Sequence, residues 1–158
     1  MNYEELIGEI LRNRSLTIST AESCTGGLLS SKLTDISGSS AYIKLNFVTY
    51  ANEAKMKMLG VEKEILETKG AVSEECAYQM AKGLQDITGS DICVSTTGIA
   101  GPTGGTANKP VGLMYSCIYT SEKYKIFKII KPSNTPRTKM KELFTDEVLK
   151  NILEFLKD

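Results

Sequence analysis

The sequence predicts an α/β fold: a single layered α/β/α domain with a mixed β-sheet. Two observations predict it. Segments with helical spacing alternate with short β-branched segments, which is typical of strands covered by helices. Near the C-terminal end two strand-like segments follow one another directly, which favours a hairpin within an otherwise parallel sheet. The length suits one domain, residues 1–158, and we find no internal repeat, linker or low-complexity segment.

The first half of the chain alternates helix and strand. Apolar residues recur with helical spacing near the N-terminus, and the next segment alternates and is rich in β-branched residues. Gly26 and Gly27 precede the second helical segment, and Gly38 ends it. In chain order we expect a helix over 3–11, a strand over 15–20, a helix over 28–36, one strand or two over 41–50, and a short helix capped by Asn52 with Glu53 in its first turn.

The second half predicts a well-marked helix, a hairpin and a long terminal helix. Ser73 is a good N-cap, and Gly89 is expected to end the helix that Ser73 begins. The apolar face of this helix should comprise Ala77, Met80, Leu84 and Ile87. Beyond it we expect a buried strand over 91–97, a loop over 98–110, neighbouring strands over 111–120 and 123–130, and a helix from Pro136 whose apolar face contains Met140, Phe144, Val148, Ile152 and Phe155.

The composition excludes several functional classes. Nineteen basic and nineteen acidic residues cancel without long runs of one sign, so nucleic acid is not an expected partner. The chain shows no signal peptide and no apolar stretch of about 18 residues, so we expect no membrane contact and a cytoplasmic location. The cysteines are widely spaced and the chain has no histidine, which argues against a metal site and for reduced thiols. No cofactor is expected.

The segment TAESCTGG, residues 20–27, has the composition of a nucleophile mounted on an anion-binding turn. Backbone N–H groups at a helix start favour an anion, and Ser23 lies just before such a turn. A tight turn with Ser23 or Thr25 as N-cap is the structural alternative. Cys24 is a rival nucleophile, because a thiol at a helix N-terminus has a depressed pKa. Adjacent residues in an extended segment point in opposite directions, so only one of Ser23 and Cys24 should face a cleft.

The loop GIAGPTGGTANKP, residues 98–110, is a second candidate. Long loops in compact domains are usually functional, and glycines let a backbone approach a ligand closely. The loop matches neither the P-loop nor the dinucleotide fingerprint. Ligand sites in such sheets lie beyond the carboxyl ends of strands, so residues 20–27 and 98–110 are candidates to meet at one site. A flexible hairpin tip is the alternative interpretation.

A serine nucleophile needs a neighbour that takes its proton, and this chain contains no histidine. Lysine, tyrosine and a carboxylate remain as candidate bases. Lysine serves where burial or nearby positive charge lowers its pKa towards neutrality. The segment FVTYANEAK offers Tyr50 at the end of a predicted strand and Lys55 in the first turn of the next helix. A core Tyr50 beside a solvated Lys55 is the structural alternative.

Several blocks of the sequence together resemble the C-terminal domain of the competence-damage-inducible protein A (CinA) family. The blocks are TAESCTGG, DISGSSAY, FVTYANEAKMKMLGV, GAVSEE and VSTTGIAGPTGGTANKPVGLMY, and in this order they cover most of residues 20–115. Stand-alone members of the family are nicotinamide-nucleotide amidohydrolases. The resemblance implies hydrolysis of nicotinamide mononucleotide (NMN) to nicotinate mononucleotide and ammonia, within pyridine-nucleotide recycling.

The resemblance also implies a Ser–Tyr–Lys site. The motif positions fall on Ser23, Tyr50 and Lys55, so Lys55, through Tyr50, would accept the serine proton while Cys24 stays a bystander. An acyl-enzyme would form, with N–H groups of the turn stabilising the oxyanion. The phosphate and ribose of the substrate would lie along one of the two glycine-rich segments. The expected substrate-binding residues are Thr25, Gly26, Gly27, Gly98, Ala100, Gly101, Gly104, Gly105, Thr106 and Arg137.

The chain departs from the family pattern near its C-terminus. An arginine-rich GDR…R block is expected there, and this chain reads SNTPRTKMK, with Arg137 at the first arginine position and Lys141 at the second. Because lysine does not hold phosphate bidentately, phosphate affinity or substrate preference should differ. The large N-terminal domain of many family members, which resembles molybdopterin-binding proteins, is not expected in this chain.

Two other functions stay open at this point. The domain could be a non-catalytic regulatory module that binds a nucleotide or phosphosugar, or an amidase or esterase for another substrate. Turnover of NMN separates these hypotheses. The family resemblance further implies a homo-oligomer, a dimer or larger.

Overall fold

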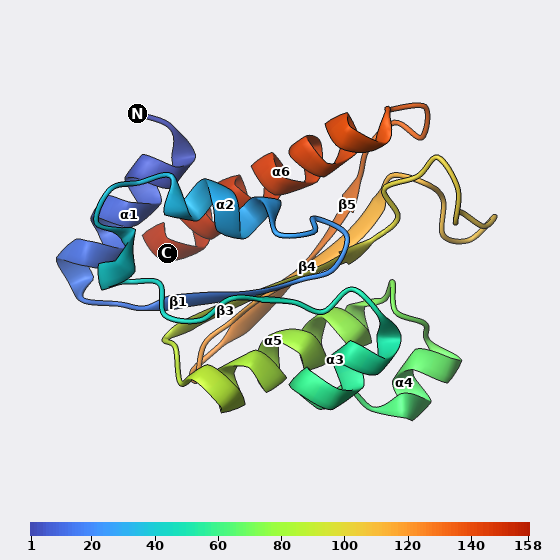
Figure 1. Cartoon of the computed structure of the whole chain (residues 1–158), viewed down its shortest axis with the longest axis horizontal. Coiled ribbons are helices and arrows are strands. Elements are labelled where there is room, and N and C mark those ends of the chain that lie inside the picture. The colour runs from blue at the N-terminus through green and yellow to red at the C-terminus, as the bar shows by residue number, and fades with distance from the viewer.

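A five-stranded mixed β-sheet forms the centre of the computed structural model, which describes all residues from 1 to 158 (Figure 1). The strands lie in the order β2–β1–β3–β4–β5. β1 is parallel to β2 and β3, whereas β3, β4 and β5 follow one another antiparallel. The strands are β1 (Ile18–Glu22), β2 (Phe47–Val48), β3 (Ile92–Gly98), β4 (Leu113–Tyr119) and β5 (Tyr124–Ile130).

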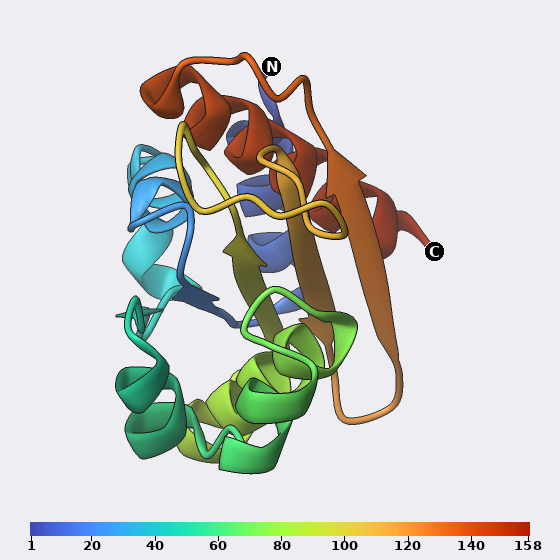
Figure 2. The same cartoon turned by 90° about the vertical axis from the view of Figure 1, so that its right-hand side faces the viewer.

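Helices cover both faces of the sheet and complete three layers (Figures 1 and 2). Helices α1, α2 and α6 pack together on one face, and α5 covers the other with α3 and α4 beside it. This arrangement confirms the predicted fold class. The helices are α1 (Tyr3–Arg14), α2 (Leu28–Thr34), α3 (Asn52–Leu59), α4 (Lys63–Thr68), α5 (Glu74–Thr88) and α6 (Arg137–Lys157). None of them combines the length and the apolar character needed to cross a bilayer.

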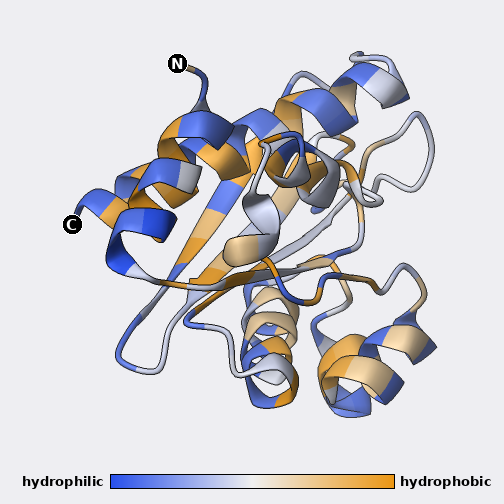
Figure 3. Cartoon of the chain, turned by 60° about the vertical axis from the view of Figure 1, so that its left-hand side comes forward, coloured by the Kyte–Doolittle hydropathy of each residue, from blue (hydrophilic) through white to orange (hydrophobic).

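Side chains of the central strand alternate between two apolar cores. Ile92 and Val94 of β3 belong to the larger core, beneath α1, α2 and α6, and Cys93 belongs to the core beneath α5. Figure 3 shows apolar bands beside polar ones along the helices, as expected where one helix face lies on a core. The predicted apolar face of α6 is buried throughout: Met140, Phe144, Val148, Ile152 and Phe155.

The first strand begins later than the sequence predicts. Helix α1 runs to Arg14, and Ser15 ends it in a left-handed conformation with φ of 54°. The strand therefore starts at Ile18 and extends to Glu22. This shift places the end of the strand directly before Ser23.

The segment 41–50 forms less strand than its composition predicts. Only the two residues of β2 pair with β1, and Ile43 adds a single bridge. Between them, the Thr20 N–H donates to Oδ1 of Asn46 at 3.0 Å, so a side chain replaces a ladder hydrogen bond. Residues 39–41 form a short 3-10 helix instead.

Three further expectations need correction. Asn52 does not cap α3, because Ala51 is the N-cap and Asn52 is the first helical residue. Ile87 is 48% exposed, because at about 100° per residue the buried face of α5 continues at Thr88. The six-residue helix α4 was not expected, and it contains no buried residue that would mark a periodic face.

Helices α3 and α5 approach so closely that position 83 must be glycine. A Cβ atom on Gly83 would lie 1.8 Å from the backbone oxygen of Leu59, the last residue of α3. The contact fixes α3 against α5, and α3 carries Lys55.

We expect Gly83→Ala to destabilise the fold. Alanine gains about 1 kcal/mol in helix propensity, but an added methyl in a tight contact costs about 1–3 kcal/mol, and here it meets backbone that cannot rotate away. The net result should be a free energy of unfolding lower by up to about 2 kcal/mol, measured by urea denaturation. Lys82→Ala, at the neighbouring exposed position, is the control and should stay near wild type. Equal stability of the two variants would contradict the packing argument.

Candidate active site

A cavity of about 270 Å³ lies where the carboxyl ends of β1 and β3 meet the start of α6. The two glycine-rich segments that follow these strands come together there, as their position after neighbouring parallel strands predicts. Cys24 and Asn52 are also part of its wall. The predicted site residues that line the cavity are Ser23, Tyr50, Lys55, Gly98, Ala100, Gly101, Gly104 and Arg137.

Other predicted binding residues do not line the cavity, namely Thr25, Gly26, Gly27, Gly105 and Thr106. Thr25 is fully buried, and its hydroxyl is bonded within the protein. The backbone of Gly105 lies against Val111, whose N atom would be 2.9 Å from an added Cβ. Thr106 closes a small turn with Lys109 through hydrogen bonds of 2.8 and 3.0 Å. These residues shape the two segments rather than face the cavity.

The backbone of Ser23 is fixed on both sides, while its hydroxyl is free. The Ser23 N–H donates to the Thr96 carbonyl at 3.0 Å, and the Ser23 carbonyl accepts from the Gly26 N–H at 3.0 Å. The side chain is 8% exposed, and its Oγ makes no hydrogen bond within the protein. An unbonded hydroxyl at the edge of a cavity, on a rigid turn, is placed to react with a bound molecule.

The anion at the N-terminus of α2 is a residue of the protein itself. Oε1 of the fully buried Glu22 accepts from the N–H groups of Gly27 at 3.2 Å and Leu29 at 2.9 Å. Oε2 accepts from the Ser30 N–H at 2.9 Å, and the Thr25 hydroxyl donates to Oε1 at 2.6 Å. This carboxylate uses the donors that the sequence suggested for a phosphate. Glu22 was missed, although an acidic residue ending a buried strand just before a helix could have indicated it.

The N–H groups of Cys24 and Thr25 are the donors of the turn that remain. Neither donates a hydrogen bond within the protein. Of the two residues, only Cys24 lines the cavity. The Cys24 N–H is therefore the donor of this turn best placed to meet an oxyanion formed at Ser23.

Lys55 is a buried amine without an acidic partner. Its side chain is 1% exposed, and Nζ donates to the backbone carbonyl of Tyr50 at 2.9 Å. No carboxylate forms an ion pair with it. Burial lowers the pKa of Lys55 below its ordinary value of 10.5, against an opposite, smaller influence of Cys76 and Cys24. Burial without a counter-charge favours the neutral amine, which is the form that accepts a proton.

Tyr50 has a different place from the relay expected of it. The Thr49 N–H donates to the Glu22 carbonyl at 2.8 Å, which brings Tyr50 beside the Ser23 turn. The hydroxyl of Tyr50 accepts from Nη2 of Arg137 at 2.7 Å, so it is turned to Arg137 and makes no hydrogen bond with Lys55. The residue is 58% exposed. Tyr50 therefore contacts Lys55 through its backbone and the cavity mouth through its side chain.

Arg137 joins the two walls of the cavity. Besides Tyr50, its guanidinium donates through Nη1 to the Gly101 carbonyl at 2.7 Å. On the far side of the loop, Nζ of Lys109 donates to the carbonyl of Lys69. The 98–110 loop is thus held at both ends, which does not support the alternative of a flexible hairpin tip.

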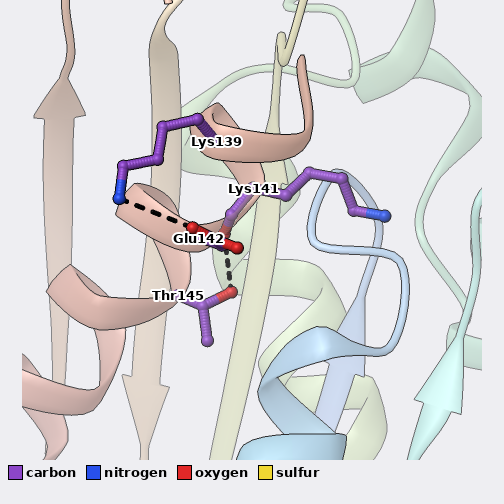
Figure 4. A network of polar contacts seen from close by, with 4 residues as sticks. All are labelled: Lys139, Lys141, Glu142 and Thr145. Carbon is purple, nitrogen blue, oxygen red and sulfur yellow. Dashed lines mark hydrogen bonds and ion pairs between the residues drawn. The ribbon is translucent and has the colours of Figure 1, made fainter. Parts of the chain in front are cut away.

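Lys141 reaches the nucleophile turn from α6. Figure 4 shows its side chain extending towards that turn, while Lys139 pairs with Glu142 at 3.5 Å. A Cβ atom on Gly26 would be 3.2 Å from Nζ of Lys141. Lys141 thus lies at the outer side of the turn and does not line the cavity.

The rival nucleophile Cys24 is in an unreactive state. Its side chain is buried in the larger core, and burial raises its pKa to about 12. The thiol is therefore not the depressed, thiolate-forming group that a helix N-terminus can produce. Glu22 already occupies that terminus, so the helix dipole offers little to the sulfur.

The comparisons with known proteins identify the family of the chain. Residues 1–156 match the family model described as the CinA C-terminal domain. The CinA-like protein of Chloroherpeton thalassium is 60% identical over 123 residues, which are 78% of this chain and 29% of that protein. The putative competence-damage inducible protein of Clostridium perfringens is 48% identical over 159 residues, 99% of this chain and 37% of that protein. The chain spans about a third of the length of these relatives.

Solved structures show the same fold. The competence/damage inducible protein CihA from Agrobacterium tumefaciens superposes with a TM-score of 0.91 at 41% identity, covering 99% of this chain and 96% of that one. The competence damage-inducible protein A from Klebsiella pneumoniae gives a TM-score of 0.92 at 29% identity, covering 99% and 98%.

We expect the folded protein to resist thiol alkylation. All four cysteines are buried, and burial raises the pKa of each to about 11 or 12. Treatment with iodoacetamide at about pH 8, followed by intact-mass measurement, should leave the native protein unmodified. The same treatment in guanidinium chloride is the control and should modify all four. Rapid modification of Cys24 in the native protein would restore it as a candidate nucleophile.

Proposed function

Because this chain belongs to the CinA C-terminal domain family, we propose that it is a nicotinamide mononucleotide deamidase, a serine amidohydrolase that converts NMN and water to nicotinate mononucleotide and ammonia. The observation that carries the proposal is the pairing, on one cavity, of a free serine hydroxyl with a buried lysine that has no acidic partner. A binding site alone has no need of a buried amine without an acidic partner. Because the chain spans about a third of the length of its relatives, the activity and the substrate of the whole protein are proposals as well.

The first half of the proposed reaction uses Ser23 and Lys55. Ser23 Oγ forms a bond to the carboxamide carbon, and its proton passes to the neutral Lys55. The two side chains share the cavity but no hydrogen bond, so one water or a rotation on substrate binding completes the path. The Lys55 ammonium then gives the proton to the amide nitrogen, and the carbon–nitrogen bond breaks with release of ammonia. An ester between Ser23 and the nicotinoyl group is left.

The second half reverses these roles. Water attacks the ester carbon and gives a proton to Lys55, the bond to Ser23 Oγ breaks, and Lys55 returns the proton to the serine. Both tetrahedral intermediates carry an oxyanion, for which the Cys24 N–H is the proposed donor. Loss of a single oxyanion donor lowers turnover by about 10²–10³. The rigid turn therefore matters to the rate as much as the nucleophile.

Arg137 is the proposed contact for the phosphate. Its guanidinium lies at the cavity and is bonded only to two neutral oxygens, the Gly101 carbonyl and the Tyr50 hydroxyl. A phosphate would form shorter, charge-assisted hydrogen bonds in their place. Since the N–H groups at the start of α2 are taken by Glu22, we assign the phosphate to the side of Arg137 and the 98–104 backbone. The expectations of a cytoplasmic location and a homo-oligomer stay predictions.

One observation favours the alternative, a binding module without catalysis. Ser23 and Lys55 form no hydrogen bond with each other. In such a module, NMN or a related phosphosugar would bind at Arg137 and stay intact. Binding without turnover is the outcome that would establish it.

The deciding experiment measures ammonia release from NMN in the presence of EDTA. We expect wild type to release ammonia, and Ser23→Ala and Lys55→Arg to lose at least about 10³ of kcat/KM, because alanine has no nucleophile and arginine, which is always protonated, cannot accept a proton. Cys24→Ser is the control and should keep most of the activity. A wild-type protein that binds NMN without releasing ammonia would leave the binding module as the function.

The pH dependence should report Lys55. As the pH falls below its lowered pKa, the amine gains a proton and stops acting as a base. We expect kcat/KM to fall by about tenfold per pH unit on the acid side, with a midpoint below 10.5. The stability of the fold should depend on pH as well. Between the lowered pKa and 10.5 the unfolded chain binds more protons than the folded chain, so the free energy of unfolding of wild type should rise with pH through that window. Lys55→Met should lack this rise. A kcat/KM independent of pH would contradict Lys55 as base.

A further inference from the structure

A buried chain of hydrogen bonds runs beneath the nucleophile turn. It consists of Glu22, Thr25 and Thr96, each fully buried. The Thr25 hydroxyl donates to Glu22 at 2.6 Å, and the Thr25 and Thr96 hydroxyl oxygens are 2.9 Å apart. The Ser23 N–H reaches the Thr96 hydroxyl at 3.3 Å. The chain thus ends on the backbone of the residue that carries the nucleophile.

The donors and acceptors fix the direction of this chain. A carboxylate only accepts, so the single hydroxyl proton of Thr25 is directed to Glu22. Thr96 must then donate its own proton to Thr25, which leaves the Thr96 oxygen free to accept from Ser23. Every hydroxyl acts as donor once and acceptor once. In a fully buried site such a polarised chain is rigid, because any rotation leaves a buried polar group unpaired.

We propose that Thr96, supported by Thr25 and Glu22, is a positioning residue for Ser23, which rests on the function proposed above. The hydroxyl of Thr96 and its own carbonyl both accept from the Ser23 N–H, at 3.3 and 3.0 Å. This double contact sets the peptide plane before Ser23, and hence the direction of Oγ. With the Gly26 N–H on the Ser23 carbonyl, it also orients the Cys24 N–H. Thr96 is fully buried and does not line the cavity.

A substitution of Thr96 tests the positioning of Ser23 without removing the cap of α2. Glu22 also accepts from the N–H groups at the start of α2, so its loss would destabilise the fold, whereas the Thr25 hydroxyl bonds only to Glu22 and Thr96. The Thr96 hydroxyl bonds to no amide of α2, so Thr96→Val removes its hydrogen bonds to Ser23 and Thr25 and leaves those between Glu22 and α2 in place. The chain also provides a matched control. Thr20, on the neighbouring strand β1, is fully buried, and its Oγ1 has no partner.

The experiment compares Thr96→Val, Thr96→Ser and Thr20→Val with wild type in NMN turnover. We expect Thr96→Val to lower kcat by about 10²-fold with KM unchanged, because misplacement of reacting groups costs about that much. Thr96→Ser keeps the hydroxyl and should restore most of kcat, and Thr20→Val should match wild type. Urea denaturation of each variant shows whether it is folded. If Thr96→Val does not fold, the comparison of Thr25→Val with Thr25→Ser tests the same chain of hydrogen bonds, one bond further from Ser23.

A second readout does not depend on the substrate. A fluorophosphonate forms a bond from Ser23 Oγ to phosphorus while fluoride leaves and the serine proton passes to Lys55 or water. The rate of labelling, followed by intact mass, should fall in Thr96→Val by about as much as kcat. If NMN is not turned over but wild type is labelled at Ser23, the proposed substrate fails and the labelling rates still test the positioning. Equal labelling rates, equal kcat, or an unlabelled and inactive wild type would overturn the role of Thr96.

Discussion

The carboxylate of Glu22 at the N-terminus of α2 is the interaction on which the site depends. A buried charge without partners is very unfavourable, and here four hydrogen bonds and the positive end of a helix dipole compensate it. Those bonds restrict the conformation of the turn. They also remove the start of α2 from the places where a ligand anion can bind. The turn that resembles a phosphate-binding turn therefore holds the backbone of Ser23 in place instead.

The opposite wall of the cavity follows from a different constraint. Lys55 must be buried to lose its charge readily, and it is 1% exposed on helix α3, whose last residue lies against Gly83 of α5. The Tyr50 carbonyl holds its amine without supplying a counter-charge. A nearby carboxylate would have raised the pKa of the amine and ended its use as a base. The two walls therefore differ in their electrostatics. The Glu22 carboxylate below Ser23 has four hydrogen bonds and a helix dipole to compensate its charge, whereas the Lys55 amine on the other wall has no counter-charge.

Much of the fold could be predicted from the sequence, because periodicity reports which face of an element is buried. The hairpin β4–β5, the face of α6 and the meeting of the two glycine-rich segments follow from local pattern and strand order. The partners of single side chains do not. Tyr50 bonds Arg137, which is distant in sequence, and Glu22 compensates a helix that the pattern left open to a ligand. Strand ends matter as well, since a one-residue difference decides which side chain faces which layer.

The contrast between Lys55 and Arg137 has a consequence for the effect of ionic strength. The pKa of Lys55 is lowered by burial, a property of the low-dielectric surroundings that mobile ions in solution do not enter. Arg137 is exposed at the mouth, where counter-ions screen its attraction for an anionic ligand. Added salt should therefore act on the capture of the ligand and leave the proton-transfer chemistry nearly unchanged. In this protein the capture of the ligand depends on long-range charge at Arg137, and proton transfer depends on the exclusion of water at Lys55.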